Sequence, residues 1–305
     1  MTSSHSAPRP ACARGPIVAA RIGSPDPRPR SALMTAAQTP FPFVDLHNHL
    51  VPGVDDGAAT VAESLEALRA LYAEGVRTLV ATPHLLLPHL DTDAAIGRAL
   101  DTQRRAFDCL AEATALEPEL PAIGLGQEIW APDAHSISRV VRRSDVGLGG
   151  SRALLVEFGF DLVGTHDDVV DAAITAGRRI VIAHPERYQY PRGLEPLDVM
   201  HRWRELGGLL QVNAGSFGGY YRNQRPGSET LAWAMVAEGL VDIIGTDHHG
   251  PRRVGVSLLE AFEMLRARGE QALGERAMVE RPGAVLRDEP VEESDEAVRS
   301  PGADA

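Results

Sequence analysis

The sequence predicts an α/β fold in which parallel strands close into a distorted, TIM-like (β/α) barrel. Short apolar segments alternate with amphipathic helical segments, a pattern typical of parallel strands that are joined and covered by helices. The chain has 305 residues, 44% of them hydrophobic, which is enough for one core of barrel size. The sequence contains no glycine-rich phosphate fingerprint of an open dinucleotide-binding sheet, and this favours the barrel.

The predicted elements follow one another from residue 43 onward. Short runs rich in Val, Ile and Leu indicate strands at 43–47, 76–82, 153–158, 178–184, 209–213 and 241–247. Helical periodicity indicates helices at 60–75 and near 166–176, 197–206 and 228–238. The first helix has the clearest boundaries, because Thr60 and Glu63 have the spacing of a capping box and Gly75 is a stop signal.

Both ends of the chain differ from this alternating region. Residues 1–42 hold eight prolines, five arginines and a single acid, Asp26, so we expect a disordered extension or a mis-assigned start, with Met34 as the other candidate start. Residues 43–285 are expected to form the barrel domain. Residues 286–305 are acidic and almost free of large apolar side chains, so we expect a disordered, solvated tail.

Composition excludes several classes of protein. A net charge of −12 argues against a protein that binds duplex nucleic acid. The sequence has no run of about 18 apolar residues, so no membrane insertion is expected. Cys12 and Cys109 lie far apart, which excludes a disulfide framework or a cysteine-rich zinc site and suits a cytoplasmic location.

Imidazole and carboxylate side chains recur where the predicted strands end. His47 and His49 are two residues apart, so on a strand they point to the same face. Glu157 lies inside an apolar strand, where an unpaired carboxylate is costly to bury. The other candidates at or after strand ends are Asp56, His84, Glu128, His184, Asp247, His248 and His249. Because chemistry in such barrels sits at the carboxyl ends of the strands, we expect these side chains to converge there.

Each candidate taken alone also has an ordinary structural explanation. A single histidine at a strand end is more often a hydrogen-bonded structural residue, and "DDG" at 55–57 suits a plain turn or a helix start. The whole set favours a metal centre, because strand after strand ends in a nitrogen or oxygen ligand. Such mixed ligands suit manganese, iron or zinc, and their number predicts two or three divalent ions.

Arg187 follows His184 by three residues and does not fit a metal ligand. A guanidinium near cations is repelled unless an anion lies between them, and its planar fork matches phosphate oxygens. Arg252 and Arg253 are further candidates for binding phosphate. The alternative is that Arg187 is a surface residue paired with an acid.

The motifs "DLHNH", "ATPH", "VIAHPER" and "TDHH" resemble those of the PHP (polymerase and histidinol phosphatase) metal-dependent phosphoesterases. More narrowly, the chain is similar to the CpsB/CapC/YwqE group of bacterial tyrosine-protein phosphatases, on these motifs together with "GQEI", "LLVEF" and "QVNAGSFGGYY". The resemblance implies a PHP-type barrel and three metal ions, usually discussed as manganese. It also implies hydrolysis of phosphotyrosine on a tyrosine kinase that controls capsule or exopolysaccharide export.

The resemblance implies roles for single residues as well. The metal ligands would be His47, His49, Asp56, His84, Glu128, Glu157, His184, Asp247 and His249. Arg187 would bind the phosphate, and His249 or His248 are candidates for a general acid. The implied nucleophile is hydroxide generated at the metal ions. A cysteine-based route needs an arginine six residues after the cysteine, but Ala115 and Val18 stand there.

Two other functions remain open from the sequence. The first is a PHP-type phosphomonoesterase that acts on a small substrate such as histidinol phosphate. The second is a metal-binding regulator without catalytic activity that docks on a kinase. The sequence also leaves open the physiological substrate, the native metal and whether the chain forms a homo-oligomer.

Overall fold

The structure is a computed structural model that describes residues 41–253 and 255–291. Its strands are β1 (Phe43–Asp45), β2 (Val76–Ala81), β3 (His84–Leu86), β4 (Ala122–Leu125), β5 (Glu128–Trp130), β6 (Ala153–Glu157), β7 (Arg179–Ala183), β8 (Leu209–Asn213) and β9 (Ile243–Gly245). Its α-helices are α1 (Val61–Ala73), α2 (Asp93–Thr114), α3 (Ala134–Ser138), α4 (Asp167–Thr175), α5 (Pro196–Glu205), α6 (Ala214–Phe217), α7 (Ser228–Ala237), α8 (Leu258–Ala267), α9 (Gln271–Glu275) and α10 (Arg281–Leu286). A π-helical segment, Arg276–Glu280, joins the last two.

The strands form a distorted barrel of parallel strands, which confirms the predicted fold class. They fall into two sheets, ordered β1-β2-β4 and β3-β5-β6-β7-β8-β9, and all pairs are parallel. β3 continues the course of β2, β5 continues that of β4, and Gly126 N donates to Ala81 O at 2.8 Å where the sheets meet. The ring is completed beyond β9 and β1, where Asp247 N donates to His47 O at 2.7 Å.

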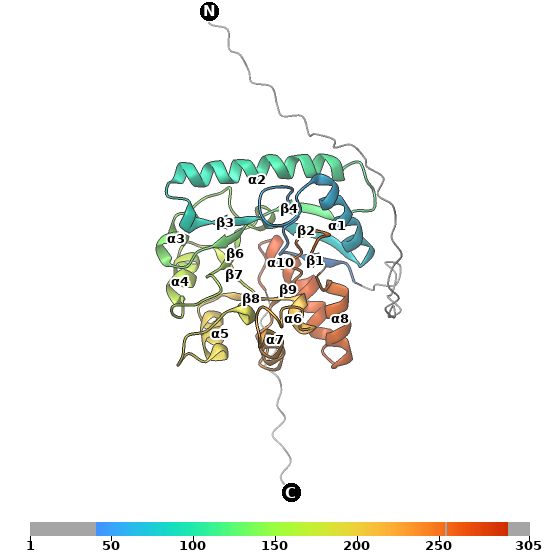
Figure 1. The fold of residues 1–305 in the computed structure, drawn as a ribbon. Helices are drawn as coiled ribbons and strands as arrows, with labels where there is room; N and C mark the ends of the chain where they lie inside the picture. The colour runs from blue at the N-terminus through green and yellow to red at the C-terminus, as the bar shows by residue number, and fades with distance from the viewer. Residues whose placement is uncertain (1–40, 254, 292–305) are drawn as a thin grey trace, which may run out of the picture.

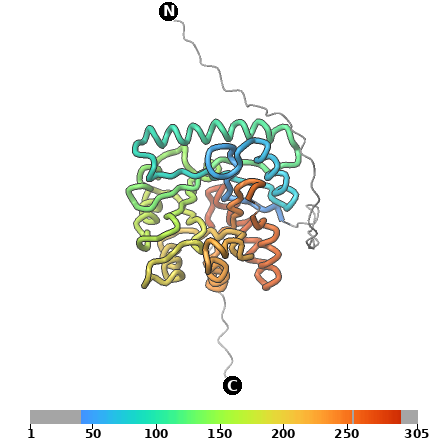
Figure 2. Tube along the Cα trace, in the orientation of Figure 1, coloured from blue at the N-terminus to red at the C-terminus, as the bar shows by residue number. Residues whose placement is uncertain are grey.

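Helices surround this ring, and the two ends of the domain meet. In Figure 1, α2 runs along one side of the barrel, α4 and α5 cover a second side, and α8 a third. Figure 2 shows the chain passing around the ring in sequence order, so that the first and last described segments lie side by side. None of the helices in the described part of the chain combines the length and apolar composition that a membrane span requires.

The interior of the barrel is an apolar core that leaves one end for the site. Side chains alternate along each strand: Leu155 of β6 points into the barrel, whereas Leu154 and Val156 pack toward the helices. The buried interior residues are Val44, Leu46, Val80, Leu148, Ala153, Leu155, Val181, Ala183, Ile243 and Val285. Since Val285 belongs to α10, this helix fills the end of the barrel opposite the carboxyl ends of the strands.

The domain extends past the predicted boundary at residue 285. Arg152 N donates to the Asp288 carboxylate at 3.0 Å, and the Arg179 side chain donates to the Glu289 carbonyl oxygen at 2.6 Å. The start of the predicted tail at 286 is therefore corrected, since residues up to 289 bond to the barrel. Residues 1–40 and 292–305, on which most of the predictions about the extension and tail fall, lie outside the described residues.

The first helix, α1, begins with a cap that differs from the predicted capping box. Glu63 N donates to Thr60 Oγ1 as expected, but the Glu63 carboxylate accepts from Ala59 N instead of closing the capping box on Thr60 N.

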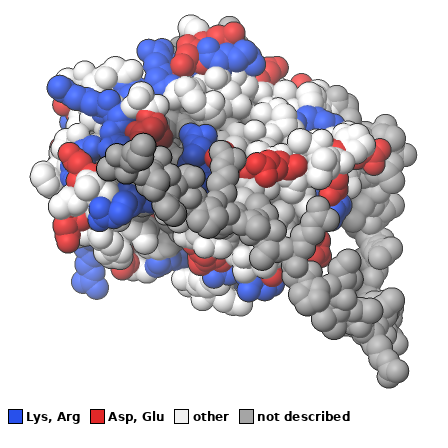
Figure 3. All heavy atoms as spheres, turned by 90° about the horizontal axis from the view of Figure 1, so that it is seen from above, with Lys and Arg blue, Asp and Glu red and all other residues white. Residues whose placement is uncertain are grey.

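The longest helix, α2, was not predicted. Figure 3 views the molecule from the side of α2, where basic and acidic side chains are interspersed. The inner face of α2 supports the site, because Gln103 Nε2 donates to the His84 carbonyl oxygen at 2.9 Å.

Candidate metal centre

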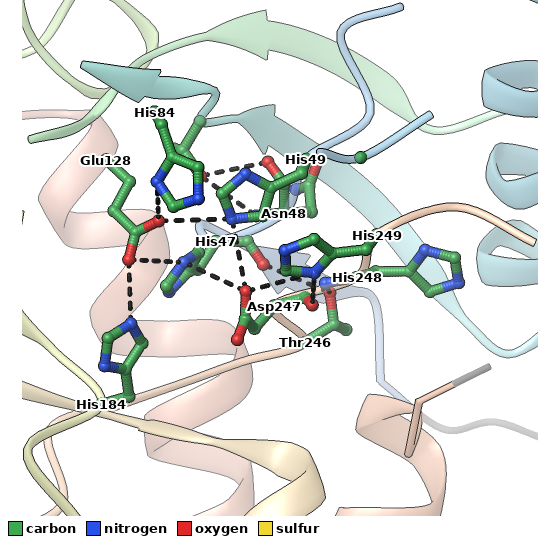
Figure 4. Close-up of polar contacts among 12 residues, drawn as sticks. His47, Asn48, His49, His84, Glu128, His184, Thr246, Asp247, His248 and His249 are labelled. Atoms are coloured by element: carbon green, nitrogen blue, oxygen red, sulfur yellow. Dashed lines mark hydrogen bonds and ion pairs between the residues drawn. The ribbon is translucent and has the colours of Figure 1, made fainter. Parts of the chain in front are cut away.

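The nine predicted ligands lie together at the carboxyl ends of the strands. Most of them are drawn in Figure 4, where imidazole rings and carboxylates from distant parts of the chain point toward one another. They form four overlapping groups whose ligand atoms all lie within 4.8 Å of one another inside each group. The groups are His49, Asp56, His84 and His249; His47, His49 and Glu128; His47, His184 and Asp247; and His84, Glu128 and Glu157.

The backbone around these residues is shaped to let them converge. His184 and Asp247, which follow β7 and β9, adopt left-handed conformations with φ of 36° and 51°. Residues other than glycine rarely adopt this conformation, and such strain gathers at functional sites. Gly245 has a packing role, because a Cβ atom there would lie 2.9 Å from the Cβ of His47.

The outer nitrogens of two histidines are held by partners that the sequence analysis did not identify. The side-chain amide oxygen Oε1 of Gln211 accepts from His47 Nδ1, and the Asp55 carboxylate accepts from His49 Nδ1, both at 2.8 Å. The Nε2 atoms of both histidines are buried and have no hydrogen-bond partner among the described residues. A buried nitrogen that is fixed from behind, and that faces carboxylates without a hydrogen bond in front, is what a metal-ligating histidine presents, so the donor set fits divalent cations.

Burial and neighbouring charges shift the pKa values of the cluster's members. Burial acts to raise the pKa of Glu128, but His47 and His84 outweigh it and hold this pKa well below its usual range. Burial and the neighbouring Glu128 raise the pKa of Glu157 to about 7. Burial, together with nearby cationic groups, lowers the pKa of His184 to about 4. Packed acids at this rim therefore need positive charge beside them, which divalent cations would supply.

Asp247 has two faces with different partners. Its Oδ1 atom lies 3.5 Å from His47 Nε2 and 3.3 Å from His49 Nε2, on the side of the candidate ligands. Its Oδ2 atom accepts from Arg187 Nη1 at 2.6 Å and from Asn213 Nδ2 at 2.8 Å. The two donors fix the carboxylate so that Oδ1 faces the cluster.

Arg187 lies in a wall of the site, and its ion pair with Asp247 is largely enclosed and not at the surface. Its side chain is only 11% exposed. The Cζ atom lies 4.0 Å from the ring centroid of Tyr221 and 4.9 Å from that of Phe160. Aromatic rings and Asp247 thus hold the guanidinium in place, and Nε remains without a hydrogen-bond partner within the described chain.

Most of the candidate ligands, together with Arg187, line a cavity of about 740 Å³. One wall consists of candidate ligands, including His84, Glu128 and His184, and another contains Arg187 and aromatic rings. The volume lies in the range of sites that take small molecules or side chains. The arrangement can hold several cations beside an anion that Arg187 would neutralise.

Residues 43–287 match the model of a family described as "Capsular polysaccharide synthesis, CpsB/CapC". The chain belongs to the CpsB/CapC family. The tyrosine-protein phosphatase YwqE of Bacillus subtilis is 28% identical over 226 residues, which cover 73% of this chain and 84% of YwqE. The putative tyrosine-protein phosphatase CapC of Staphylococcus aureus is 28% identical over 208 residues, 68% of this chain and 77% of CapC.

A solved structure supports the same assignment. The crystal structure is described as one of YwqE from B. subtilis and CpsB from Streptococcus pneumoniae, metal-dependent tyrosine phosphatases. It superposes with a TM-score of 0.67 at 25% identity, covering 82% of this chain and 97% of that chain. The recognised family is therefore confirmed, and its solved relative shares the barrel.

Two other predicted residues of this CpsB/CapC protein lie away from the main cavity. Arg252 donates to the Gly57 carbonyl oxygen at 3.2 Å and lines a smaller neighbouring pocket, so the structure does not bring it to the main site. His248 points away from the cluster in Figure 4, and its Nδ1 accepts from Gly250 N. His248 therefore does not face the site, contrary to its prediction as a candidate general acid.

The other phosphate-binding candidate, Arg253, and the other general-acid candidate, His249, do line the main cavity. Arg253 donates to the Asp56 carboxylate at 2.8 Å, so its charge is already shared with a candidate ligand. His249 donates from Nδ1 to the Asp247 carbonyl oxygen at 2.8 Å, which leaves Nε2 3.5 Å from Asp56 Oδ1. His249 is thus the one of the two general-acid candidates that faces the site.

Proposed function

We propose that this chain is a metal-dependent protein-tyrosine phosphatase that uses no cysteine nucleophile. The observation that carries the proposal is the convergence of nine nitrogen and oxygen donors in four overlapping groups, beside a cavity that Arg187 also lines. Membership of a family whose named relatives are tyrosine-protein phosphatases supports phosphotyrosine as the substrate.

We propose that the four overlapping groups hold two or three divalent ions. Manganese is the expected ion, and iron or zinc would fit the same imidazole and carboxylate donors. When bound, such ions lower the pKa of water to roughly 7 and thereby supply hydroxide at neutral pH. Gln211 and Asp55 orient two imidazoles from behind, so they would act on metal affinity.

Two side chains of the chain itself are proposed to act on the phosphate ester. Arg187 would neutralise the equatorial phosphate oxygens, on which charge spreads in the transition state. His249 would protonate the leaving phenolate, whose pKa of about 10 makes it easier to expel than an alkoxide. Because Nδ1 of His249 is engaged by the Asp247 carbonyl oxygen, its Nε2 either binds an ion or donates the proton.

We propose a phosphotyrosine protein, most directly a tyrosine kinase of polysaccharide export, as the partner, and the cytoplasm as the location. The family description as capsular polysaccharide synthesis supports this partner. Neither nucleic acid nor membrane insertion is part of the proposal, because the net charge is −12 and the described helices lack a membrane span.

The test compares substrates on one purified sample. Hydrolysis of a phosphotyrosine peptide and of histidinol phosphate is measured before chelation, after chelation and after return of Mn²⁺. The proposal expects peptide hydrolysis that is lost with the metal, restored with Mn²⁺, and preferred over histidinol phosphate. A strong preference for histidinol phosphate would favour a small-molecule phosphomonoesterase. A protein inert toward both substrates with Mn²⁺ present would favour a regulator that only binds metal.

A further inference from the structure

Tyr220 is an exposed aromatic ring at the mouth of the metal site. Among the described residues, three large hydrophobic side chains stand out as exposed, namely Leu116, Val163 and Tyr220. Tyr220, at 44% exposed, is the one of these three that lines the main cavity. Exposed apolar surface at the edge of a polar cavity is typical of a contact surface for a ligand.

The chain holds this ring in place without burying it. Tyr220 packs edge-on against Tyr221, with ring centroids 5.0 Å apart. Beneath both rings lies Gly215, where a Cβ atom would be 3.1 Å from Tyr221 Cε2 and 3.2 Å from Tyr220 Cβ. The close approach of the Gly215 backbone therefore allows the pair to lie over the start of α6, with Tyr221 buried and Tyr220 facing the cavity.

The position of Tyr220 relates it to the arginine that faces the phosphate. The guanidinium of Arg187 stacks on Tyr221 at 4.0 Å, and Tyr220 is the next ring outward. In a phosphotyrosine, one bridging oxygen separates the phosphorus from the phenyl ring. Arg187 and Tyr220 line the same cavity, so an ester whose phosphate is held by Arg187 can place its phenyl ring against Tyr220, and aromatic rings attract one another at centroid distances of about 4.5–7 Å.

We propose that Tyr220 is a specificity-determining residue that recognises the aromatic ring of the substrate. The inference rests on the proposed phosphatase function and deepens it, because it assigns the preference for aryl over alkyl phosphate esters to one side chain. Arg187 and the metal ions would bind both kinds of ester equally, since they contact only the phosphate. The ring of Tyr220 adds a contact that an alkyl group cannot match.

The experiment measures binding instead of turnover. Full-length protein loaded with Mn²⁺ is titrated by calorimetry with phenylphosphonate and with methylphosphonate, which share the anionic head and differ in the ring. Wild type is expected to prefer phenylphosphonate. Tyr220→Leu should reduce this preference by about two- to tenfold, the worth of one aromatic pair, while the dissociation constant for methylphosphonate stays within about twofold.

Two further variants make the result specific. Tyr220→Phe keeps the ring and should keep the preference for phenylphosphonate. Val163→Ala removes an exposed hydrophobic side chain that does not line the cavity, and should change neither dissociation constant. An unchanged preference in Tyr220→Leu, or a parallel loss of both ligands, overturns the inference. If wild type does not hydrolyse a phosphotyrosine peptide, the proposed function fails instead, whatever the binding preference.

Discussion

Gln211 offers a test of the site that touches neither a candidate ligand's coordinating atom nor the substrate. It lies on β8 and is fully buried, and its side-chain Oε1 accepts from Nδ1 of His47 at 2.8 Å. Replacing it with leucine keeps the bulk but removes the acceptor. His47 would then lose the bond that fixes its ring and its tautomer, with Nε2 still aimed at the cluster.

The magnitude follows from the role of this hydrogen bond. Loss of an outer partner of a metal-bound histidine typically weakens metal affinity by about 10- to 100-fold. At about 1.4 kcal/mol for each factor of ten, this corresponds to about 1.4–2.8 kcal/mol. Because His47 belongs to two of the four ligand groups, we expect the binding of more than one ion to weaken.

The assay is a titration of the chelated protein with Mn²⁺, followed by calorimetry and by recovery of phosphotyrosine hydrolysis. Gln103→Leu is the matched control, because Gln103 is also buried but bonds to a backbone carbonyl oxygen and not to an imidazole. We expect Gln211→Leu to need about 10- to 100-fold more Mn²⁺ than this control. Equal Mn²⁺ requirements in the two variants would refute the reasoning, since lost stability alone would then explain any effect.

Three further predictions follow from other parts of the molecule. His184→Ala should abolish hydrolysis and lower the metal content measured by elemental analysis, because it removes a ligand of the group that contains Asp247; full metal content with full activity would contradict this. Arg187→Ala should keep the bound metal yet lower kcat by about 100-fold, the effect of removing one donor to developing charge; unchanged turnover would remove Arg187 from phosphate binding. Glu74→Gln should alter the pH dependence of stability, because burial and the nearby Glu260 raise the pKa of Glu74 from 4.5 to about 7. An acid whose pKa is raised in the folded state destabilises the fold as the pH rises through this range. The variant should therefore be more stable than wild type at pH 8 by about 1 kcal/mol, after allowance for partial exposure, and equal to it below pH 4.5. Thermal melts at both pH values check this, and a gain in stability that is greater at low pH would contradict it.

Most of the candidate ligands could be found in the sequence because they stand at the ends of apolar strands, whereas the full set of nine was what the family resemblance implied. His47 and His49 show the two-residue spacing of one strand face, and Glu157 is a carboxylate where the pattern requires an apolar residue. Parallel strands of a barrel bring such positions to one rim, so sequence order and fold class together were enough to expect convergence.

The supporting residues had weaker signals. Gln211 and Asn213 also share one strand face, but neutral amides in a strand have many structural uses, and no spacing marks them as partners of a histidine or of Asp247. Asp55 and Asp56 are neighbours in one turn, and only the conformation of the loop decides that Asp55 supports His49 while Asp56 faces the cluster. The same holds for Arg252, whose direction depends on contacts with Gly57.

Some elements of the fold were missed for reasons of pattern. Strands β3, β4 and β5 have only three or four residues each, and Pro83 and Gly126 interrupt the apolar runs to which they belong. The helix α2 carries many charged residues and only a narrow apolar stripe, which includes Ile96, Leu100 and Phe107. Tertiary packing of this stripe, more than local sequence, stabilises the helix.

The number of metal ions per chain tests the central claim most directly. Protein purified without chelator and then equilibrated with Mn²⁺ would be separated from free metal and measured by elemental analysis beside wild-type activity. The convergence of four ligand groups predicts two or three tightly bound ions per chain, with hydrolysis of phosphotyrosine rising as they are restored. Less than one ion per chain, or full activity in protein stripped of metal, would contradict the account.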